Sequence, residues 1–290
     1  MAPRVVVAEK IAESGIQTLR ECCEVDLAVG VERSELLSRL ADAEGLIVRS
    51  ATQVDAEMIA AAPNLRVIGR AGIGVDNIDL AAATEAGIVV VNAPQANIIS
   101  AAEHALALML AQARNIPRAD ATLRSGVWER SKFEGVELHG KTLGIIGLGR
   151  IGSLVAERAR AFGMHILGHD PYVSQEHWRR LGVEMVDLDT LLSTSDFITV
   201  HLPLTADTKG LIGKDALARV KPTARIVNAS RGGIIDEEAL AEAIREGRLA
   251  GAALDVFSKE PLTQSPLFEL DQVVVTPHLG ASTAEAQDKA

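Results

Sequence analysis

The segment 141–170, KTLGIIGLGRIGSLVAERARAFGMHILGHD, constrains the fold of this chain more than any other stretch. Its apolar run Thr142–Ile146 predicts a buried strand, and three glycines follow that run in G-x-G-x-x-G spacing. A helical apolar pattern comes next, and Met164–Gly168 predicts a second strand that leads to Asp170. Strand, glycine turn, helix, strand and acidic residue is the order that a dinucleotide-binding site requires.

Each part of this segment has a physical role in binding a nucleotide. Gly147 permits a tight turn, Gly149 lets the backbone approach a pyrophosphate, and Gly152 lets the helix pack closely against the strand. The free N–H groups at the helix N-terminus then face the anion. Asp170 can accept hydrogen bonds from a ribose diol and would repel a 2′-phosphate, so the segment predicts NAD rather than NADP. The alternative is an ordinary strand–helix turn, which the surrounding pattern disfavours.

The rest of the chain alternates short β-branched runs with helical patterns, which predicts an α/β fold with two doubly wound parallel-sheet domains. We expect a flavodoxin-like domain at 1–98, joined by the start of a returning helix at 282–290, and a Rossmann domain at 99–281. The strands predicted for the first domain are 5–8, 46–48, 67–68 and 89–91, with 24–28 a weaker candidate. Those predicted for the second domain beyond Asp170 are 197–202, 225–228, 252–256 and 273–276.

Three segments lie outside this alternation. Ser100–Gln112 predicts an apolar helix between the two domains, and we interpret His104 on it as structural rather than as a ligand. Asn115–Phe133 has little regular apolar pattern and predicts a long loop that is functional or contacts a partner. Near the end, Ser282 and Glu285 form an S-x-x-E capping box that predicts the start of a helix.

Composition excludes several classes of function. The formal net charge of −10 argues against nucleic acid or an anionic membrane as the main partner. The two cysteines, Cys22 and Cys23, are adjacent and form neither a disulfide framework nor a metal-ligand pattern. The apolar run near the N-terminus is too short for a signal peptide, and no stretch approaches the length of a membrane span. We therefore expect a cytoplasmic protein without a metal site.

Polar groups follow two predicted strands of the first domain. Ligand sites in open α/β sheets lie beyond the carboxyl ends of the strands. Arg49 and Ser50 follow one strand, and a glycine-containing loop with Arg70, Gly72 and Ile73 follows another. A guanidinium beside free backbone N–H groups can bind a carboxylate or a phosphate, although arginines in such loops can also be merely solvated.

The strands of the second domain are followed by an arginine, an acid and a histidine. Hydride transfer at a carbon that bears oxygen needs a group that exchanges the hydroxyl proton, and a histidine suits this task. It also needs a fixed positive charge to hold a substrate carboxylate, for which arginine has the matching planar shape. Arg231, Glu260 and His278 supply the three groups. Spacing alone leaves open that each is an ordinary loop or core residue.

The chain resembles the D-isomer-specific 2-hydroxyacid dehydrogenase family. The segments that carry this resemblance are 143–152, 169–171, 228–237, 251–261 and 276–283. It implies that Arg231, Glu260 and His278 form a catalytic trio. The NAD contacts that it implies are Gly147, Gly149, Arg150, Ile151, Gly152, Asp170, Ala229 and Asp255. The implied contacts with a small anionic substrate are Arg49, Ser50, Arg70, Gly72 and Ile73.

Segments 69–79, 91–110 and 196–205 are most similar to the branch of this family that oxidises 3-phospho-D-glycerate to 3-phosphohydroxypyruvate, the first step of serine synthesis. The resemblance also implies a homodimer or larger homo-oligomer, in which the loop at 128–130 reaches the partner's active site. Because the family's C-terminal helix continues beyond the equivalent of Ala290, it further implies a truncated catalytic core. The alternatives are a hydroxypyruvate or glyoxylate reductase of the same family and an NADH-sensing, corepressor-like binding protein. Formate dehydrogenases are disfavoured because they have Gln in place of Glu260.

Overall fold

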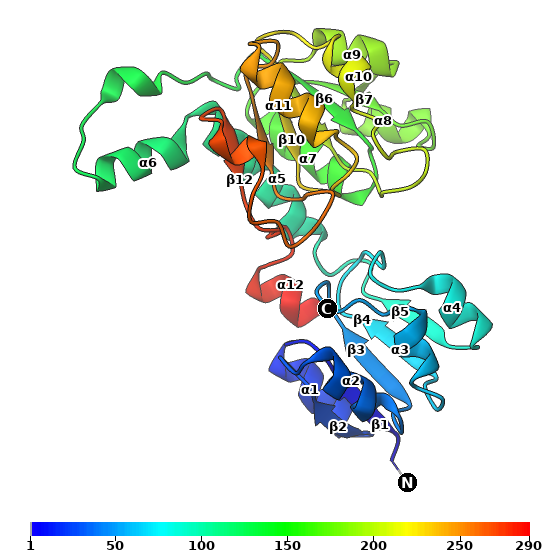
Figure 1. Cartoon of the computed structure of the whole chain (residues 1–290). Coiled ribbons are helices and arrows are strands. Elements are labelled where there is room, and N and C mark those ends of the chain that lie inside the picture. The colour runs from blue at the N-terminus through cyan, green and yellow to red at the C-terminus, as the bar shows by residue number, and fades with distance from the viewer. Residues whose placement is uncertain (1) are drawn as a thin grey trace. The chain divides into compact units, whose positions relative to one another are not determined.

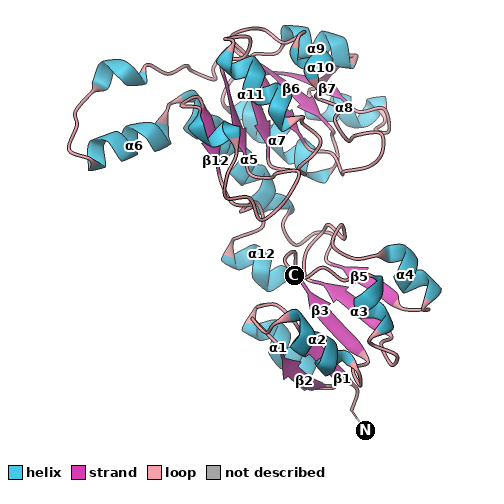
Figure 2. Ribbon diagram, in the orientation of Figure 1, coloured by secondary structure: helices cyan, strands magenta, loops and turns pink. Residues whose placement is uncertain are grey.

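The structure, a computed structural model, describes residues 2–290, apart from the side chain of Gln175 (Figure 1). It divides into two compact units, one of Met1–Asn97 with Ala281–Ala290 and the other of Ile98–Gly280. Each unit contains one parallel sheet with helices along the chain between its strands (Figure 2). The α/β class predicted from the alternating pattern is therefore confirmed.

The first unit has a sheet in the order β2-β1-β3-β4-β5, and every described pairing in it is parallel. Its strands are β1 Arg4–Val7, β2 Glu24–Leu27, β3 Gly45–Val48, β4 Val67–Arg70 and β5 Val89–Asn92. Its helices are α1 Glu13–Arg20, α2 Arg33–Leu40, α3 Ala56–Ala60, α4 Leu80–Glu85 and α12 Ala284–Lys289. Val6, Leu46 and Ile68 of the inner strands are wholly buried, whereas β2 is an edge strand without a buried residue, which explains its weak sequence pattern.

The second unit has a sheet in the order β12-β11-β10-β9-β6-β7-β8, also parallel in every described pairing. Its strands are β6 Thr142–Ile146, β7 His165–His169, β8 Glu184–Met185, β9 Phe197–Val200, β10 Arg225–Asn228, β11 Gly251–Leu254 and β12 Val273–Val275. Its helices are α5 Ile98–Ala113, α6 Ile116–Arg124, α7 Arg150–Ala161, α8 Gln175–Leu181, α9 Leu188–Thr194, α10 Lys214–Leu217 and α11 Glu237–Arg245, with 3-10 turns η1 Arg130–Phe133 and η2 Pro266–Glu269.

Neighbouring residues of the central strand β6 face opposite sides of this sheet. Ile145 belongs to the apolar cluster that contains residues of α5 and α7, and Ile146 belongs to the cluster that contains residues of α11. The chain leaves β6 toward β7 and β8 on one side and later returns to β9 on the other. The order of the strands therefore reverses between β6 and β9, which is where a doubly wound sheet binds ligands.

The prediction of a loop at Asn115–Phe133 was wrong. The segment contains α6 and η1, and Figure 1 shows it extending away from the rest of its unit. No residue of α6 is buried, so the helix packs no apolar face into the core of its unit. Asp120 and Arg124 pair one turn apart along it, at 2.8 Å.

The predicted start of the last helix was also displaced. Thr283, not Ser282, is the N-cap of α12, and its hydroxyl accepts a hydrogen bond from the Ala286 N–H at 3.1 Å. Both residues have a hydroxyl that can cap, but capping from Thr283 places Ala286 inside the first unit with 3% exposure. The helix is tied to that unit by a bond of 2.5 Å from the Ser14 hydroxyl to Asp288.

Candidate active site and nucleotide-binding loop

The sheet of the second unit brings six sequence segments to the edge at which its parallel strands end. Adjacent strands run in register, from β7 through β6, β9 and β10 to β12. The residues that follow these strands are, in chain order, Gly147 after β6, Asp170 after β7, His201 after β9, Arg231 after β10, Asp255 and Glu260 after β11, and His278 after β12. Predicted cofactor and catalytic residues thus follow neighbouring strands of one sheet.

The glycine loop after β6 has the shape that a pyrophosphate needs. A Cβ on Gly147, whose φ is 93°, would lie 2.6 Å from the His201 carbonyl oxygen, and a Cβ on Gly152 would lie 2.1 Å from the Gly147 carbonyl oxygen. Only glycine fits at these two positions. By contrast, a Cβ on Gly149 would meet no atom within 4 Å, so open space lies above the loop. Gly149 is also the N-cap of α7 and supplies no side chain to its first N–H groups, which suits an anion.

Asp170, the predicted ribose ligand, supports the glycine loop. It is 8% exposed, and its oxygens accept hydrogen bonds from the Leu148 N–H at 2.8 Å and the Tyr172 N–H at 2.9 Å. Each carboxylate oxygen can accept a second hydrogen bond, which leaves capacity for ribose hydroxyls. Arg150 and Ile151 begin α7 directly after the loop. The residues present therefore fit NAD.

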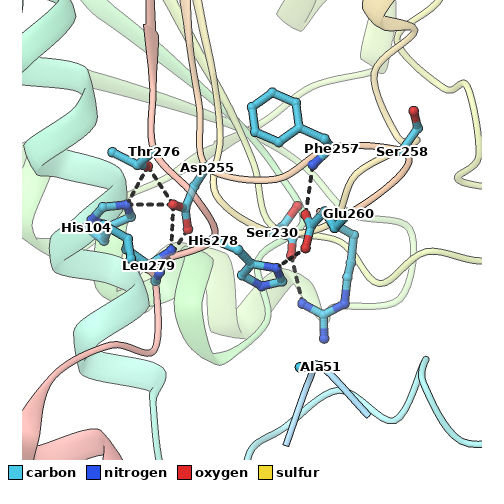
Figure 3. A network of polar contacts seen from close by, with 12 residues as sticks. Ala51, His104, Ser230, Asp255, Phe257, Ser258, Glu260, Thr276, His278 and Leu279 are labelled. Carbon is cyan, nitrogen blue, oxygen red and sulfur yellow. Dashed lines mark hydrogen bonds and ion pairs between the residues drawn. The ribbon is translucent and has the colours of Figure 1, made fainter. Parts of the chain in front are cut away.

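His278 and Glu260 form an acid–base pair, since Nδ1 of His278 lies 2.6 Å from Oε2 of Glu260 (Figure 3). The other carboxylate oxygen accepts a bond of 2.9 Å from the Phe257 N–H. Burial raises the pKa of Glu260, but the bonds from His278 and Phe257 outweigh it and hold this pKa below its usual value. An ionised Glu260 can only accept, so Nδ1 of His278 donates. Nε2 is then the nitrogen that can exchange a proton with a substrate.

Arg231 is held by a turn in which Asn228, a residue without a predicted role, makes the supporting hydrogen bonds. Asn228 is 2% exposed, and its amide donates to the Arg231 carbonyl at 2.9 Å and accepts from the Ser230 N–H at 3.0 Å. The Arg231 guanidinium donates to the Ser230 carbonyl at 2.7 Å. A Cβ on Gly232 would lie 1.8 Å from the Phe257 carbonyl oxygen, so the turn packs against the segment that leads to Glu260. This packing keeps the arginine segment beside the acid segment.

Asp255 is wholly buried, and its carboxylate holds the segment of His278. It accepts bonds from the Thr276 hydroxyl at 2.5 Å, the Leu279 N–H at 2.7 Å and the Gly280 N–H at 2.8 Å. Burial raises its pKa, but bonds from His104, Thr276 and Leu279 outweigh that effect and lower it overall. The structure therefore gives Asp255 a role in shaping the loop. Its contact with the cofactor, like that of the half-buried Ala229, stays a prediction.

His201 is a further residue of this edge without a predicted role. Burial of its ring lowers its pKa to about 4, so it is neutral at physiological pH. Its Nε2 lies 3.0 Å from the Thr199 hydroxyl, and its backbone carbonyl is the group that excludes a side chain at Gly147. The backbone of His201 thus packs directly against the glycine loop.

In the first unit, Arg49 and Ser50 follow strand β3, and Arg70 is the last residue of the adjacent strand β4, with Gly72 and Ile73 after it. Glu9 accepts hydrogen bonds from the Arg49 N–H at 2.8 Å, the Ala51 N–H at 3.2 Å and the Thr52 N–H at 2.9 Å. Asn77 donates to the carbonyls of Arg49 at 2.8 Å and Thr52 at 2.6 Å. Neither Glu9 nor Asn77 was identified from the sequence, because both act on the backbone.

Arg70 lies directly over the glycine loop that follows β4. A Cβ on Gly72, whose φ is 153°, would lie 1.5 Å from Nη1 of Arg70, so a larger residue would displace the guanidinium. Arg70 also lines a cavity of about 520 Å³ within the first unit, together with Asn92 and Ile11. The predicted binding groups therefore lie at the carboxyl ends of two neighbouring strands; they are Arg49, Ser50, Arg70, Gly72 and Ile73.

Within residues 2–290, no helix is long and apolar enough to cross a bilayer. Over the same part of the chain, no group of three or more His, Cys, Asp or Glu residues is arranged to hold a metal ion.

Comparisons with known proteins agree with this geometry. The family profile described as "D-isomer specific 2-hydroxyacid dehydrogenase, NAD binding domain" matches residues 106–280. The chain is 57% identical over 288 residues to D-3-phosphoglycerate dehydrogenase of Mycobacterium leprae and 56% identical over 286 residues to that of Archaeoglobus fulgidus. These matches cover 99% and 98% of the chain but only 54% of each relative, so the chain spans about half the length of the curated relatives that it matches.

Solved structures of other proteins have a similar fold over nearly the whole chain. The TT0316 protein of Thermus thermophilus superposes with a TM-score of 0.91 at 37% identity, over 99% of this chain and 92% of that one. D-lactate dehydrogenase of Aquifex aeolicus, complexed with NAD and lactic acid, superposes with a TM-score of 0.86 at 27% identity, over 98% of this chain and 91% of that one.

Proposed function

Because the chain belongs to the D-isomer specific 2-hydroxyacid dehydrogenase family, we propose that it oxidises 3-phospho-D-glycerate at C2 with NAD. The observation that carries this proposal is the 2.6 Å bond between His278 and Glu260. That pair lies at the same edge of one sheet as a glycine loop shaped for a pyrophosphate. An oriented histidine beside a nucleotide site is the arrangement that hydride transfer from a hydroxy acid requires.

In this reaction, the residues of the chain would bind the substrate and accept its proton. Bound NAD supplies the acceptor for the hydride that leaves C2 of the substrate. Arg231 binds the substrate carboxylate through its planar guanidinium. Nε2 of His278 takes the hydroxyl proton. Nδ1 keeps its own proton and continues to donate it in a hydrogen bond to Glu260. The ring becomes positively charged at that moment, and the ionised Glu260 beside it stabilises that charge.

Asp170 would decide the choice of cofactor. Its carboxylate accepts ribose hydroxyls and repels a 2′-phosphate, so NAD is preferred over NADP. We expect Asp170→Ala to reduce this preference by about ten- to a hundredfold, the scale of hydrogen bonds to a charged group. The measurement is kcat/KM with each cofactor. An unchanged ratio would contradict the ribose contact, and Asp207→Ala, at an exposed residue outside the proposed site, is the control.

The phosphorylated substrate is supported by the names of the similar proteins and by the arginines of the first unit. We infer that this unit is the substrate-binding domain and that the second unit is the NAD-binding domain. Arg49 and Arg70 would supply the positive charge that a phosphate needs, and Ser50, Gly72 and Ile73 would supply further hydrogen bonds.

The exposed segment around α6 supports a homodimer. Its apolar side chains Ile116, Leu123, Val127 and Trp128 are 52%, 55%, 42% and 76% exposed. Such a cluster is typical of a surface that a second copy covers. In that dimer, the residues at 128–130 would reach the active site of the partner subunit. The expectations of a cytoplasmic location and of no nucleic-acid partner stay predictions from composition.

The test is NADH formation from 3-phospho-D-glycerate beside D-glycerate and D-2-hydroxyglutarate, with NADH binding measured in parallel. A clear preference for 3-phospho-D-glycerate is the expected result. Preference for D-glycerate would reject the phosphate pocket and keep the dehydrogenase mechanism. Binding of NADH without turnover of any of these acids would reject the proposed reaction and favour a protein that senses NADH.

A further inference from the structure

His104, on the helix α5, contacts the network that holds the segment of His278. Its Nε2 lies 3.1 Å from Oδ1 of Asp255 and 3.1 Å from the Thr276 hydroxyl (Figure 3). The side chain of His104 is 20% exposed, whereas Asp255 is not exposed at all. His104 is thus the side chain through which α5 reaches a buried charge at the end of β11.

The hydrogens of this network can be assigned from the partners. The pKa of Asp255 is lowered, so its carboxylate is ionised and can only accept. The single hydroxyl proton of Thr276 goes to that carboxylate at 2.5 Å. Neither oxygen that faces Nε2 of His104 has a proton to give, so Nε2 must carry one and donate it. His104 is therefore a fixed donor to the buried carboxylate.

This donor matters because Asp255 determines the conformation of the residues beside it. The Asp255 carboxylate binds the N–H groups of Leu279 and Gly280, and its backbone carbonyl accepts from the His278 N–H at 2.8 Å. His278 has a φ of 55°, which a non-glycine residue adopts rarely and which the surrounding structure must enforce. Removing one donor from a buried carboxylate would reorient the carboxylate and loosen the turn that it holds.

The same segment also packs directly on α5. A Cβ built on Gly280 would lie 3.3 Å from Oδ2 of Asp255 and 4.0 Å from Cα of Ala101, one turn before His104. The turn therefore rests between the buried carboxylate and the backbone of α5. The two contacts with α5, through His104 and at Ala101, are independent observations of the same coupling.

We propose that His104 is a positioning residue, which through Asp255 fixes the 276–280 turn and so aims His278 at the substrate. This rests on the proposed function, because it assumes that His278 exchanges a proton with a hydroxy acid. His104 itself touches neither substrate nor cofactor in this account. Its removal should therefore lower kcat more than it changes the affinity for NADH or the KM for the acid.

The experiment compares three variants in the full chain. His104→Leu removes the donor in a helix where leucine packs well, and His104→Gln keeps an N–H donor near the position of Nε2. Glu103→Gln, at the exposed neighbouring residue of α5, is the matched control. For each protein we would measure kcat, KM and NADH affinity, and the hydrogen exchange of the Leu279 and Gly280 amides by NMR.

We expect His104→Leu to lose about ten- to a hundredfold in kcat, the scale of a reacting group displaced by up to an ångström. NADH affinity should change less than threefold, and the two amides should exchange faster. His104→Gln should recover most of kcat and amide protection, and Glu103→Gln should match the unmodified protein. Normal kcat in His104→Leu, or equal losses in the leucine and glutamine variants, would overturn the proposal.

The amide measurement keeps this test separate from the test of the reaction. If the unmodified protein turns over none of the acids, the proposed function has failed, and unchanged amide exchange in His104→Leu would then reject the positioning role on its own. If His104→Leu does not fold, Thr276→Val removes the neighbouring hydroxyl from the same carboxylate and should show the same loss of kcat. Normal kcat in a folded Thr276→Val would count against the network.

Discussion

Two loops of this molecule are held in the same way but to different degrees. In the second unit, Asp255 accepts hydrogen bonds from the backbone of the 276–280 turn, and in the first unit, Glu9 accepts them from the 49–52 loop. Asp255 is wholly buried, whereas Glu9 is partly exposed. In both places, a carboxylate on one segment fixes the backbone of another that follows a neighbouring strand.

We propose that the difference in burial separates a loop for chemistry from a loop for binding. A buried charge without its donors is very unfavourable, so Asp255 keeps its turn in one conformation. Glu9 can exchange its bonds with water at little cost, and the 49–52 loop can adjust to a ligand. On this account, the turn that carries His278 controls kcat, and the loop that carries Arg49 controls KM.

The largest effect should come from His278→Asn. Loss of the group that exchanges the proton should lower kcat by about 100- to 10,000-fold, the usual contribution of general acid–base catalysis. NADH affinity should stay unchanged, because the glycine loop follows a different strand. The measurement is steady-state turnover beside NADH titration. His165→Asn, at an exposed residue at the start of β7, is the control, and near-normal turnover in His278→Asn would remove His278 from the mechanism.

Next in size is the effect of Asp255→Asn on stability. The amide would turn N–H groups toward donors such as the Gly280 N–H, so we expect a loss of about 3 kcal/mol in the free energy of unfolding at pH 7. Chemical denaturation measures this value. An unfolding free energy within about 0.5 kcal/mol of the original protein would contradict the role of the buried charge.

The contribution of Asp255 to stability should depend on pH. The folded pKa of Asp255 lies below its ordinary value of 3.8, so its contribution is complete above that pH and is lost as the pH falls below it. Asp255→Asn should therefore flatten the loss of stability below about pH 4 relative to the original protein. An unchanged slope in that range would mean that other carboxylates cause the acid sensitivity.

The smallest effect should come from Glu9→Gln. The 49–52 loop would lose one acceptor but keep its bonds to Asn77, so KM for the acid should rise by about three- to tenfold, the scale of one hydrogen bond. The value of kcat should be nearly unchanged, unlike in variants of the 276–280 turn. Initial rates over a range of substrate concentrations separate the two constants, and a fall in kcat without a change in KM would reverse the comparison.

Most of the fold could be predicted from the sequence because both sheets are parallel and their central strands are buried. Strands such as Thr142–Ile146 and Arg225–Asn228 contain buried apolar residues and lie between turn residues, and the structure has them at those bounds. The helix α6 could not be predicted, since it buries no residue. The strand β8 has two exposed residues, which leave no pattern to recognise.

The candidate site was predictable in its residue types but not in its supports. The order of strands placed Arg231, Glu260 and His278 at one edge, and the structure adds the contact between the last two. The roles of Asn228 and His104 could not be predicted. Asn228 acts through backbone groups, and His104 acts through a buried carboxylate. A single sequence shows the residue that meets a substrate more readily than the residue that holds it in place.

In the proposed reaction, hydride passes from C2 of the substrate to the cofactor. The most direct measurement is the mass of the NADH formed from 3-phospho-D-glycerate that carries deuterium at C2. The account predicts one deuterium in the dihydronicotinamide ring of every NADH molecule produced. NADH without deuterium, or no NADH from this substrate, would contradict it.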